Sequence, residues 1–131
     1  MGDPTPPVVA ILNSSDDTVE MLRFMLEAEG MVAVSAHVDA IRRGQFDFSA
    51  FVAEHDPEVV IYDLSPPYDR TWLFLQHLKG LSVMQGRQFV LTSTNPERVR
   101  QIAGTDADIL EVVGKPYDMQ LIVDAVKAAL R

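Results

Sequence analysis

Cysteine is absent from the sequence, which excludes disulfide bonds, thiolate nucleophiles and cysteine-based zinc or iron–sulfur sites. No apolar run reaches the roughly 18 residues that a membrane-spanning helix needs. Basic residues are few: 11 Lys and Arg stand against 19 Asp and Glu, which gives a formal net charge of −8. An acidic surface of this kind repels nucleic acid. We therefore expect no membrane span and no direct contact with nucleic acid.

Phosphate-binding glycine motifs are also missing. Neither G-x-G-x-x-G nor the P-loop pattern occurs, so a small nucleotide-binding enzyme has little support. The composition of the 131 residues, 47% hydrophobic and 23% charged, is typical of one globular domain. Residues 1–7 are rich in Gly and Pro and lack the basic start of a secretory signal. We expect a flexible N-terminal lead over 1–7, one domain over 8–131 and a cytoplasmic location.

Short apolar runs alternate with helical patterns along the chain. Continuous apolar runs without strict alternation are typical of strands that are covered on both faces. They predict strands over 8–12, 31–35, 59–62, 89–91 and 109–113. Apolar residues at helical spacing predict helices over 17–29, 48–55, 71–81, 95–102 and 119–130. Gly30 is placed to end the first helix, and Asn95-Pro96 and Asp118 are placed to begin the last two.

This alternating order predicts an α/β fold: a doubly wound, five-stranded parallel sheet with helices on both faces. The connection over 37–47 is long for a loop, and we expect it to be extended or partly helical. In such sheets ligands bind beyond the carboxyl ends of the strands, near the point where strand order reverses. The polar residues at those ends are Asn13 to Asp17, Asp63, Thr92 and Lys115.

A carboxylate, a hydroxyl and an ammonium group are thus expected at one rim of the sheet. A carboxylate can attack a phosphoryl group to give an acyl phosphate. The transferred group carries spread negative charge, which a lysine, a metal ion and hydrogen-bond donors stabilise. Asp63, Thr92 and Lys115 supply three of these four parts, and the metal site is the fourth.

Four segments occur in the order, and at the strand ends, where receiver domains carry them. In chain order they are AILNSSDDTVEMLRFMLEAEG, VVIYDLSPP, VLTS and VGKPYD. Over residues 8–131 the chain resembles the receiver domain of two-component response regulators, a flavodoxin-like fold. The resemblance implies that Asp63 accepts phosphate from a phosphohistidine, that Thr92 and Lys115 bind the phosphoryl group, and that the Ser65 main-chain carbonyl ligates Mg²⁺. It also implies a cis bond before Pro116.

The same resemblance implies partners. A histidine kinase or phosphotransfer protein would supply the phosphate. A homodimer or another partner would use the face formed by helix 95–102, strand 109–113 and helix 119–130. The chain would not be an enzyme beyond self-phosphotransfer and autodephosphorylation at Asp63.

The sequence departs from the receiver pattern at the metal site. Asn13 and Ser14 occupy the two positions that are acidic in receivers, which leaves a weak Mg²⁺ site with Asp63 and the Ser65 carbonyl. Val112 stands where receivers commonly carry a switching aromatic ring. These departures favour an alternative, a phosphorylation-independent pseudo-receiver that acts as a protein-interaction or dimerisation module.

Asp16 and Asp17 allow two interpretations. Asp17 followed by Glu20 resembles a capping box, and Asp16 suits a helix N-terminus. Alternatively, both carboxylates take part in the metal site. We interpret the Arg42-Arg43 pair as a solvated loop that is open to a partner.

Overall fold

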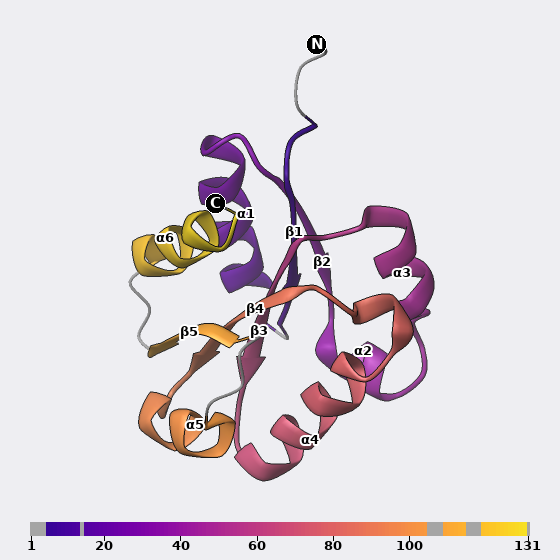
Figure 1. Cartoon of the computed structure of the whole chain (residues 1–131), viewed down its shortest axis with the longest axis vertical. Helices are drawn as coiled ribbons and strands as arrows, with labels where there is room; N and C mark the ends of the chain where they lie inside the picture. The colour runs from indigo at the N-terminus through magenta and orange to yellow at the C-terminus, as the bar shows by residue number, and fades with distance from the viewer. Residues whose placement is uncertain (1–4, 14, 105–108, 115–118, 131) are drawn as a thin grey trace.

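The computed structural model describes residues 5–13, 15–104, 109–114 and 119–130, and for 109–114 and 119 the backbone alone (Figure 1). The strands are β1 Val8–Leu12, β2 Val32–Ala36, β3 Val59–Leu64, β4 Gln88–Ser93 and β5 Ile109–Gly114. The helices are α1 Asp16–Ala28, α2 Val38–Arg42, α3 Phe48–His55, α4 Tyr68–Lys79, α5 Pro96–Ala103 and α6 Met119–Ala129, with a 3₁₀ turn, η1, at Ser82–Met84.

The strands form one parallel sheet in the order β2-β1-β3-β4-β5, which confirms the predicted doubly wound α/β fold. The chain passes from β1 outward to β2 and then crosses to β3 on the other side of β1. Strand order therefore reverses between β1 and β3, where a ligand site is expected at the carboxyl ends.

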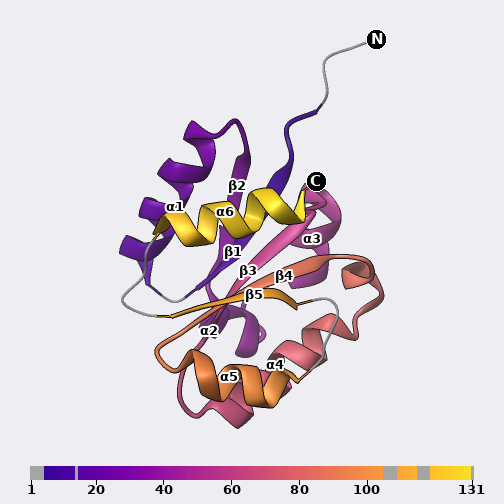
Figure 2. The same cartoon turned by 60° about the vertical axis from the view of Figure 1, so that its left-hand side comes forward.

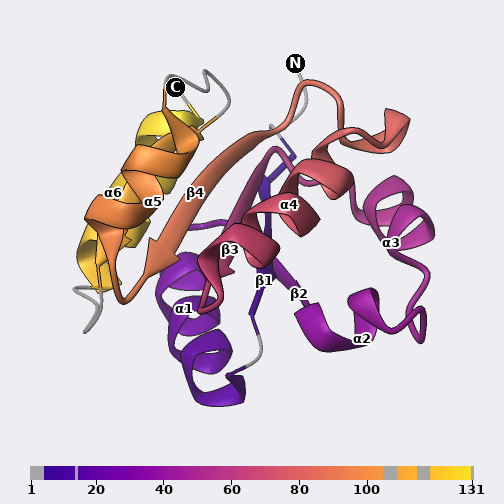
Figure 3. The ribbon, with the colours of Figure 1, turned by 90° about the horizontal axis from the view of Figure 1, so that it is seen from below.

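Helices cover both faces of the sheet, as Figures 2 and 3 show. On one face, alternate strand residues such as Val60 and Tyr62 pack with Ile41 of α2, Val52 of α3 and Leu75 of α4. On the other face, α1 and α6 contribute to a second cluster. Their residues in it are Val19, Leu22, Leu26, Ile122, Val123 and Val126. Both faces of the central strands are buried, which is why their sequences are apolar runs rather than alternating patterns.

Local signals set most of the element ends. Gly30 has a φ of +84° and closes α1, with its N–H donating to the Glu27 carbonyl at 3.0 Å. Asn95 caps α5 by accepting from the Arg98 N–H at 3.1 Å, as predicted. Among the described residues, no helix combines the length and the apolar character that a membrane span requires.

Two connections differ from the sequence-based expectations or refine them. The 37–47 connection is partly helical, because Ile41 is buried on the sheet and Gly44, with a φ of +72°, ends the α2 turn. Helix α4 begins at Tyr68 rather than at Thr71 and ends at Lys79 rather than at Leu81. Its start was missed because Pro67, at the N-cap, offers no capping side chain.

Candidate functional site

Asp63 and Thr92 lie side by side at the carboxyl ends of β3 and β4. The parallel register pairs these two residues directly, so their side chains leave the sheet on the same side. Thr92 is buried, and its hydroxyl donates to Asp63 Oδ1 at 2.7 Å. Asp63 is half-buried, because it lies one residue before the end of β3, at the rim of the sheet. The structure thus brings together the predicted acceptor carboxylate and the predicted hydroxyl.

Asn13 lies at the neighbouring strand end, level with Asp63, because the register pairs Leu12 with Tyr62. It is buried, and its side-chain oxygen accepts from the Ser15 N–H at 2.8 Å. This bond fixes the turn into α1. Asn13 therefore occupies the expected place near the acceptor, but its oxygen serves the backbone of the following loop.

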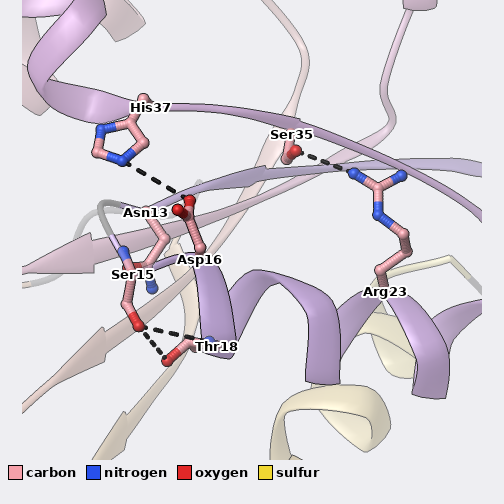
Figure 4. A network of polar contacts seen from close by, with 7 residues as sticks. All are labelled: Asn13, Ser15, Asp16, Thr18, Arg23, Ser35 and His37. Atoms are coloured by element: carbon pink, nitrogen blue, oxygen red, sulfur yellow. Dashed lines mark hydrogen bonds and ion pairs between the residues drawn. The ribbon is translucent and has the colours of Figure 1, made fainter.

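Ser15 caps α1, so the prediction that Asp17 is the capping residue is wrong. The Ser15 hydroxyl accepts from the Thr18 N–H at 3.4 Å and from the Thr18 hydroxyl at 3.1 Å (Figure 4). Asp16 and Asp17 form the first turn, where the helix dipole favours acidic residues. The Asn13 turn places Ser15 at the N-cap position, so that Asp16 and Asp17 fall inside the helix.

Asp16 lies at the solvent-exposed start of α1, near the end of β2. Its side chain is 91% exposed and lies 3.9 Å from His37 Nε2, on the connection after β2 (Figure 4). Asp17 is exposed as well. Neither carboxylate is positioned as a buried partner of Asp63, and the described geometry does not favour the metal interpretation of this pair.

The loop after Asp63 is anchored by Thr71. The Thr71 hydroxyl donates to the Ser65 carbonyl at 2.9 Å and lies 3.1 Å from the Tyr68 carbonyl. The Pro66-Pro67 bond in this loop is cis. The Ser65 carbonyl, which the resemblance assigns to the metal, therefore already accepts one strong hydrogen bond.

A pocket of about 310 Å³ adjoins Asp63 at this rim. It is lined by residues of the β3 end, the following loop, the first turn of α4 and α2, namely Asp63, Ser65, Pro66, Pro67, Thr71, Val38, Asp39 and Arg42. The sequence-based interpretation of Arg42 as part of a solvated loop missed this position. Val38 and Arg42 are one turn apart and so lie on one side of α2, but a five-residue helix has too little sequence pattern to signal this in advance.

The charges at this site affect the pKa of Tyr62, which is buried in the core. Burial raises the pKa of its hydroxyl well above the usual value, the Arg42 charge lowers it and the Asp63 charge raises it further. The hydroxyl donates to the Thr71 carbonyl at 3.4 Å. Arg42 and Asp63 thus act with opposite sign on one buried group, which indicates that their fields overlap at the rim.

A second contact joins the loops on the β4 side of Asp63. The hydroxyls of Tyr68, at the start of α4, and Thr94, after β4, lie 2.7 Å apart. Nearby, Arg98 of α5 forms an exposed ion pair with Asp69 of α4 at 3.4 Å. Any movement of the Thr92 segment toward Asp63 would therefore act on the first turn of α4.

The described donors do not fit the usual Mg²⁺ ligand set. Mg²⁺ prefers an octahedron of oxygens that includes carboxylates and water. Asp63 is the one carboxylate of the expected set, while the Asn13 oxygen and the Ser65 carbonyl already accept hydrogen bonds. Within the part of the chain that the structure describes, no three His, Asp or Glu side chains gather as metal ligands. The weak magnesium site remains a prediction.

Several predicted features lie outside the described residues: Ser14, Lys115, the bond before Pro116 and the Asp118 cap. The backbone of β5 is described to Gly114, which pairs with Ser93 of β4. The part that Lys115 takes in the site therefore stays a prediction.

The arrangement of strands and helices matches that of solved signalling proteins. A sensor protein from Polaromonas sp. aligns with a TM-score of 0.72 at 21% identity, over 95% of each chain. The chemotaxis protein CheY4 of Vibrio cholerae aligns with a TM-score of 0.74 at 14% identity, over 95% of this chain and 99% of that one. A response regulator from Thermotoga maritima aligns with a TM-score of 0.74 at 14% identity, over 96% and 98%.

No protein-family model matches the chain, and no curated protein matches it in sequence. The structural likeness covers nearly the whole length of each protein compared, so the chain has the fold of response-regulator receiver domains. Because one fold hosts many functions, the function must be argued from the residues at the rim.

Proposed function

We propose that the chain is a signal receiver in which Asp63 accepts a phosphoryl group from a histidine kinase or a phosphotransfer protein. The observation that carries the proposal is the hydrogen bond from the buried Thr92 hydroxyl to Asp63 Oδ1 at 2.7 Å. This bond lies at the rim of a sheet of the receiver fold, beside the strand-order reversal where ligands bind. Lys115 would supply a cation to the same group.

The chemical step is a phosphoryl transfer. An Asp63 carboxylate oxygen forms a bond to phosphorus as the bond from phosphorus to the donor imidazole nitrogen breaks, and the released imidazole takes up a proton. The Thr92 hydroxyl then donates to a phosphoryl oxygen rather than to the free carboxylate. The product is an acyl phosphate that carries about two negative charges near the β4 end, where the free carboxylate carried one.

The new charge would act on partner binding. Movement of Thr92 toward the phosphoryl group would shift the loop that contains Thr94 and, through it, α5. The face formed by α5, β5 and α6 would then change its preference for a second copy or another partner. This is a population shift between two arrangements of one surface.

A second candidate is the pseudo-receiver, which binds partners without phosphorylation. The Asn13 geometry favours it specifically, because the buried amide serves the α1 turn where a metal-binding carboxylate is expected. Val112 adds to it, since that position offers no ring.

Treatment with acetyl phosphate and Mg²⁺, followed by intact mass spectrometry, separates the two candidates. The receiver proposal expects the parent to gain one phosphoryl group and Asp63→Asn to gain none. Asp17→Asn, which removes an exposed carboxylate from the α1 turn, is the matched control and should be phosphorylated like the parent. The proposal fails if the parent gains nothing at high Mg²⁺, or if Asp63→Asn is modified equally.

A further inference from the structure

The pocket beside Asp63 contains a guanidinium that the receiver resemblance does not assign to any role. Of the described residues that line it, Arg42 contributes positive charge and Asp39 and Asp63 contribute negative charge. The Arg42 side chain is 54% exposed and donates from Nη2 to Asp39 Oδ1 at 2.9 Å. Such a half-exposed pair is held weakly, so the guanidinium can exchange partners at little cost.

The fold holds Arg42 at the rim through α2. Ile41, the preceding residue, is buried among the side chains that cover the sheet, and Gly44 ends the helix two residues later. Val38 lines the pocket one turn before Arg42. The backbone of Arg42 is therefore anchored beside the β3 end, while its long side chain remains adjustable.

The Arg42 charge reaches the acceptor strand. Tyr62 precedes Asp63, and the charges of Arg42 and Asp63 act on its buried hydroxyl in opposite directions. This coupling agrees with the shared pocket, which both residues line.

We propose that Arg42 is a cationic ligand of the phosphoryl oxygens in the Asp63 pocket, beside Lys115, and that it takes the place of Mg²⁺ there. The inference deepens the proposed function and rests on it. The described donors fit magnesium poorly, because Asp63 is the one carboxylate of the expected set and the Asn13 oxygen and the Ser65 carbonyl each already accept one hydrogen bond. A guanidinium needs no ligand set, and its planar fork binds two phosphate oxygens at once.

Asp39 holds Arg42 before phosphorylation. One carboxylate competes for the guanidinium with a phosphoryl group that carries about two negative charges, so Arg42 moves to the phosphoryl group once it forms. The same exchange releases Asp39 and alters the surface of α2. Removal of the Asp39 charge should therefore strengthen the interaction of Arg42 with phosphate.

The first experiment measures the rate of phosphorylation by acetyl phosphate in EDTA and in Mg²⁺. The parent should react at similar rates in both conditions. Arg42→Gln should react about tenfold more slowly in EDTA, the loss expected for one charge-assisted contact to phosphate. Arg43→Gln is the matched control: it removes the same charge from the adjacent exposed residue, which does not line the pocket, and should react like the parent.

The outcomes distinguish this inference from the proposed function. If the parent reacts only with Mg²⁺, or if Arg42→Gln and Arg43→Gln react equally, the role of Arg42 is overturned while phosphorylation of Asp63 stands. If the parent does not react in either condition, the proposed function fails, and a binding measurement decides on Arg42.

That measurement titrates inorganic phosphate into Asp63→Asn and follows the Arg42 side-chain and Thr71 amide signals by NMR. The neutral amide does not repel the anion. Addition of Arg42→Gln should weaken binding about tenfold, and addition of Arg43→Gln should not. The inference is overturned if phosphate does not bind, or if Arg42→Gln leaves the phosphate affinity unchanged.

Discussion

The two ends of the parallel sheet hold arginines that differ in burial and in how many hydrogen bonds their guanidinium groups donate. At the amino end, Arg87 precedes β4, and its side chain is only 15% exposed. It donates to the Val83 carbonyl at 2.9 Å, the Pro57 carbonyl at 2.6 Å and Asp56 Oδ1 at 2.8 Å. At the carboxyl end, Arg42 is 54% exposed and pairs with Asp39.

The difference separates structural from chemical use of the same residue type. Arg87 satisfies backbone carbonyls that would otherwise be buried without a donor, so its interactions stabilise the fold. Arg42 borders a pocket and has donors to spare for an incoming anion. The rim residues Asp63 and Thr92 share this end with Arg42. We therefore expect substitutions at the amino end to change stability alone and those at the carboxyl end to change phosphate chemistry.

The largest effect on stability is expected from Arg87→Met. The apolar stem is kept, but the Val83 and Pro57 carbonyls lose their donor, which should lower the free energy of unfolding by about 2 kcal/mol. Urea denaturation measures the loss. Arg70→Met at an exposed site should change it by less than about 0.5 kcal/mol. The comparison fails if Arg87→Met, while folded, also changes the rate of phosphorylation at Asp63.

Thr92→Val should have a smaller effect on stability and a larger one on chemistry. It keeps the shape of a buried side chain but removes the donor to Asp63, which should lower the free energy of unfolding by about 1 kcal/mol. The yield of acyl phosphate should fall, because a phosphoryl oxygen loses a donor. Thr92→Ser, which restores the hydroxyl, should recover most of the yield. Equal yields for the Val and Ser variants would contradict a role for the hydroxyl.

The sheet and the Asp63–Thr92 pair were predictable from sequence for the same reason. Apolar runs such as 59–62 and 89–91 identify buried parallel strands, and their carboxyl ends must meet at one rim. The residues that follow those runs, Asp63 and Thr92, are therefore brought together by register alone. The α3 bounds, 48–55, were also predictable, since Asp47 caps that helix and Asp56 ends it with a φ of +48°.

Arg42 and the α1 cap were not predictable in this way. The approach of Arg42 to Asp63 depends on how α2 folds back over the rim, and a five-residue helix has too little pattern to show this. The choice of Ser15 over Asp17 as the cap depends on the Asn13 turn at the end of β1, a tertiary feature. Propensity ranks Ser and Asp as nearly equal caps and cannot decide between them.

Asn13→Asp tests whether magnesium can be restored at the carboxyl end. The carboxylate can still accept from the Ser15 N–H, so the free energy of unfolding should change by about 0.5 kcal/mol or less. A second carboxylate beside Asp63 should strengthen Mg²⁺ binding and make phosphorylation depend on the metal. Calorimetric titration with Mg²⁺ and rates in EDTA measure both. Unchanged Mg²⁺ affinity would show that Asn13 does not border the phosphate site.

Tyr68→Phe should have the smallest effect on stability and should separate phosphorylation from its consequence. The hydroxyl contact to Thr94 lies on the exposed side of the rim, so its removal should change the free energy of unfolding by less than about 0.5 kcal/mol. Asp63 and Thr92 are left intact, and the yield of acyl phosphate should match the parent. The NMR shifts that phosphorylation produces in α4 should shrink, because this hydrogen bond joins the loop after β4 to the first turn of α4. Shifts in α4 as large as those of the parent would mean that the Tyr68–Thr94 hydrogen bond does not couple phosphorylation to α4. A coupling through α2 and Arg42 would then be the alternative.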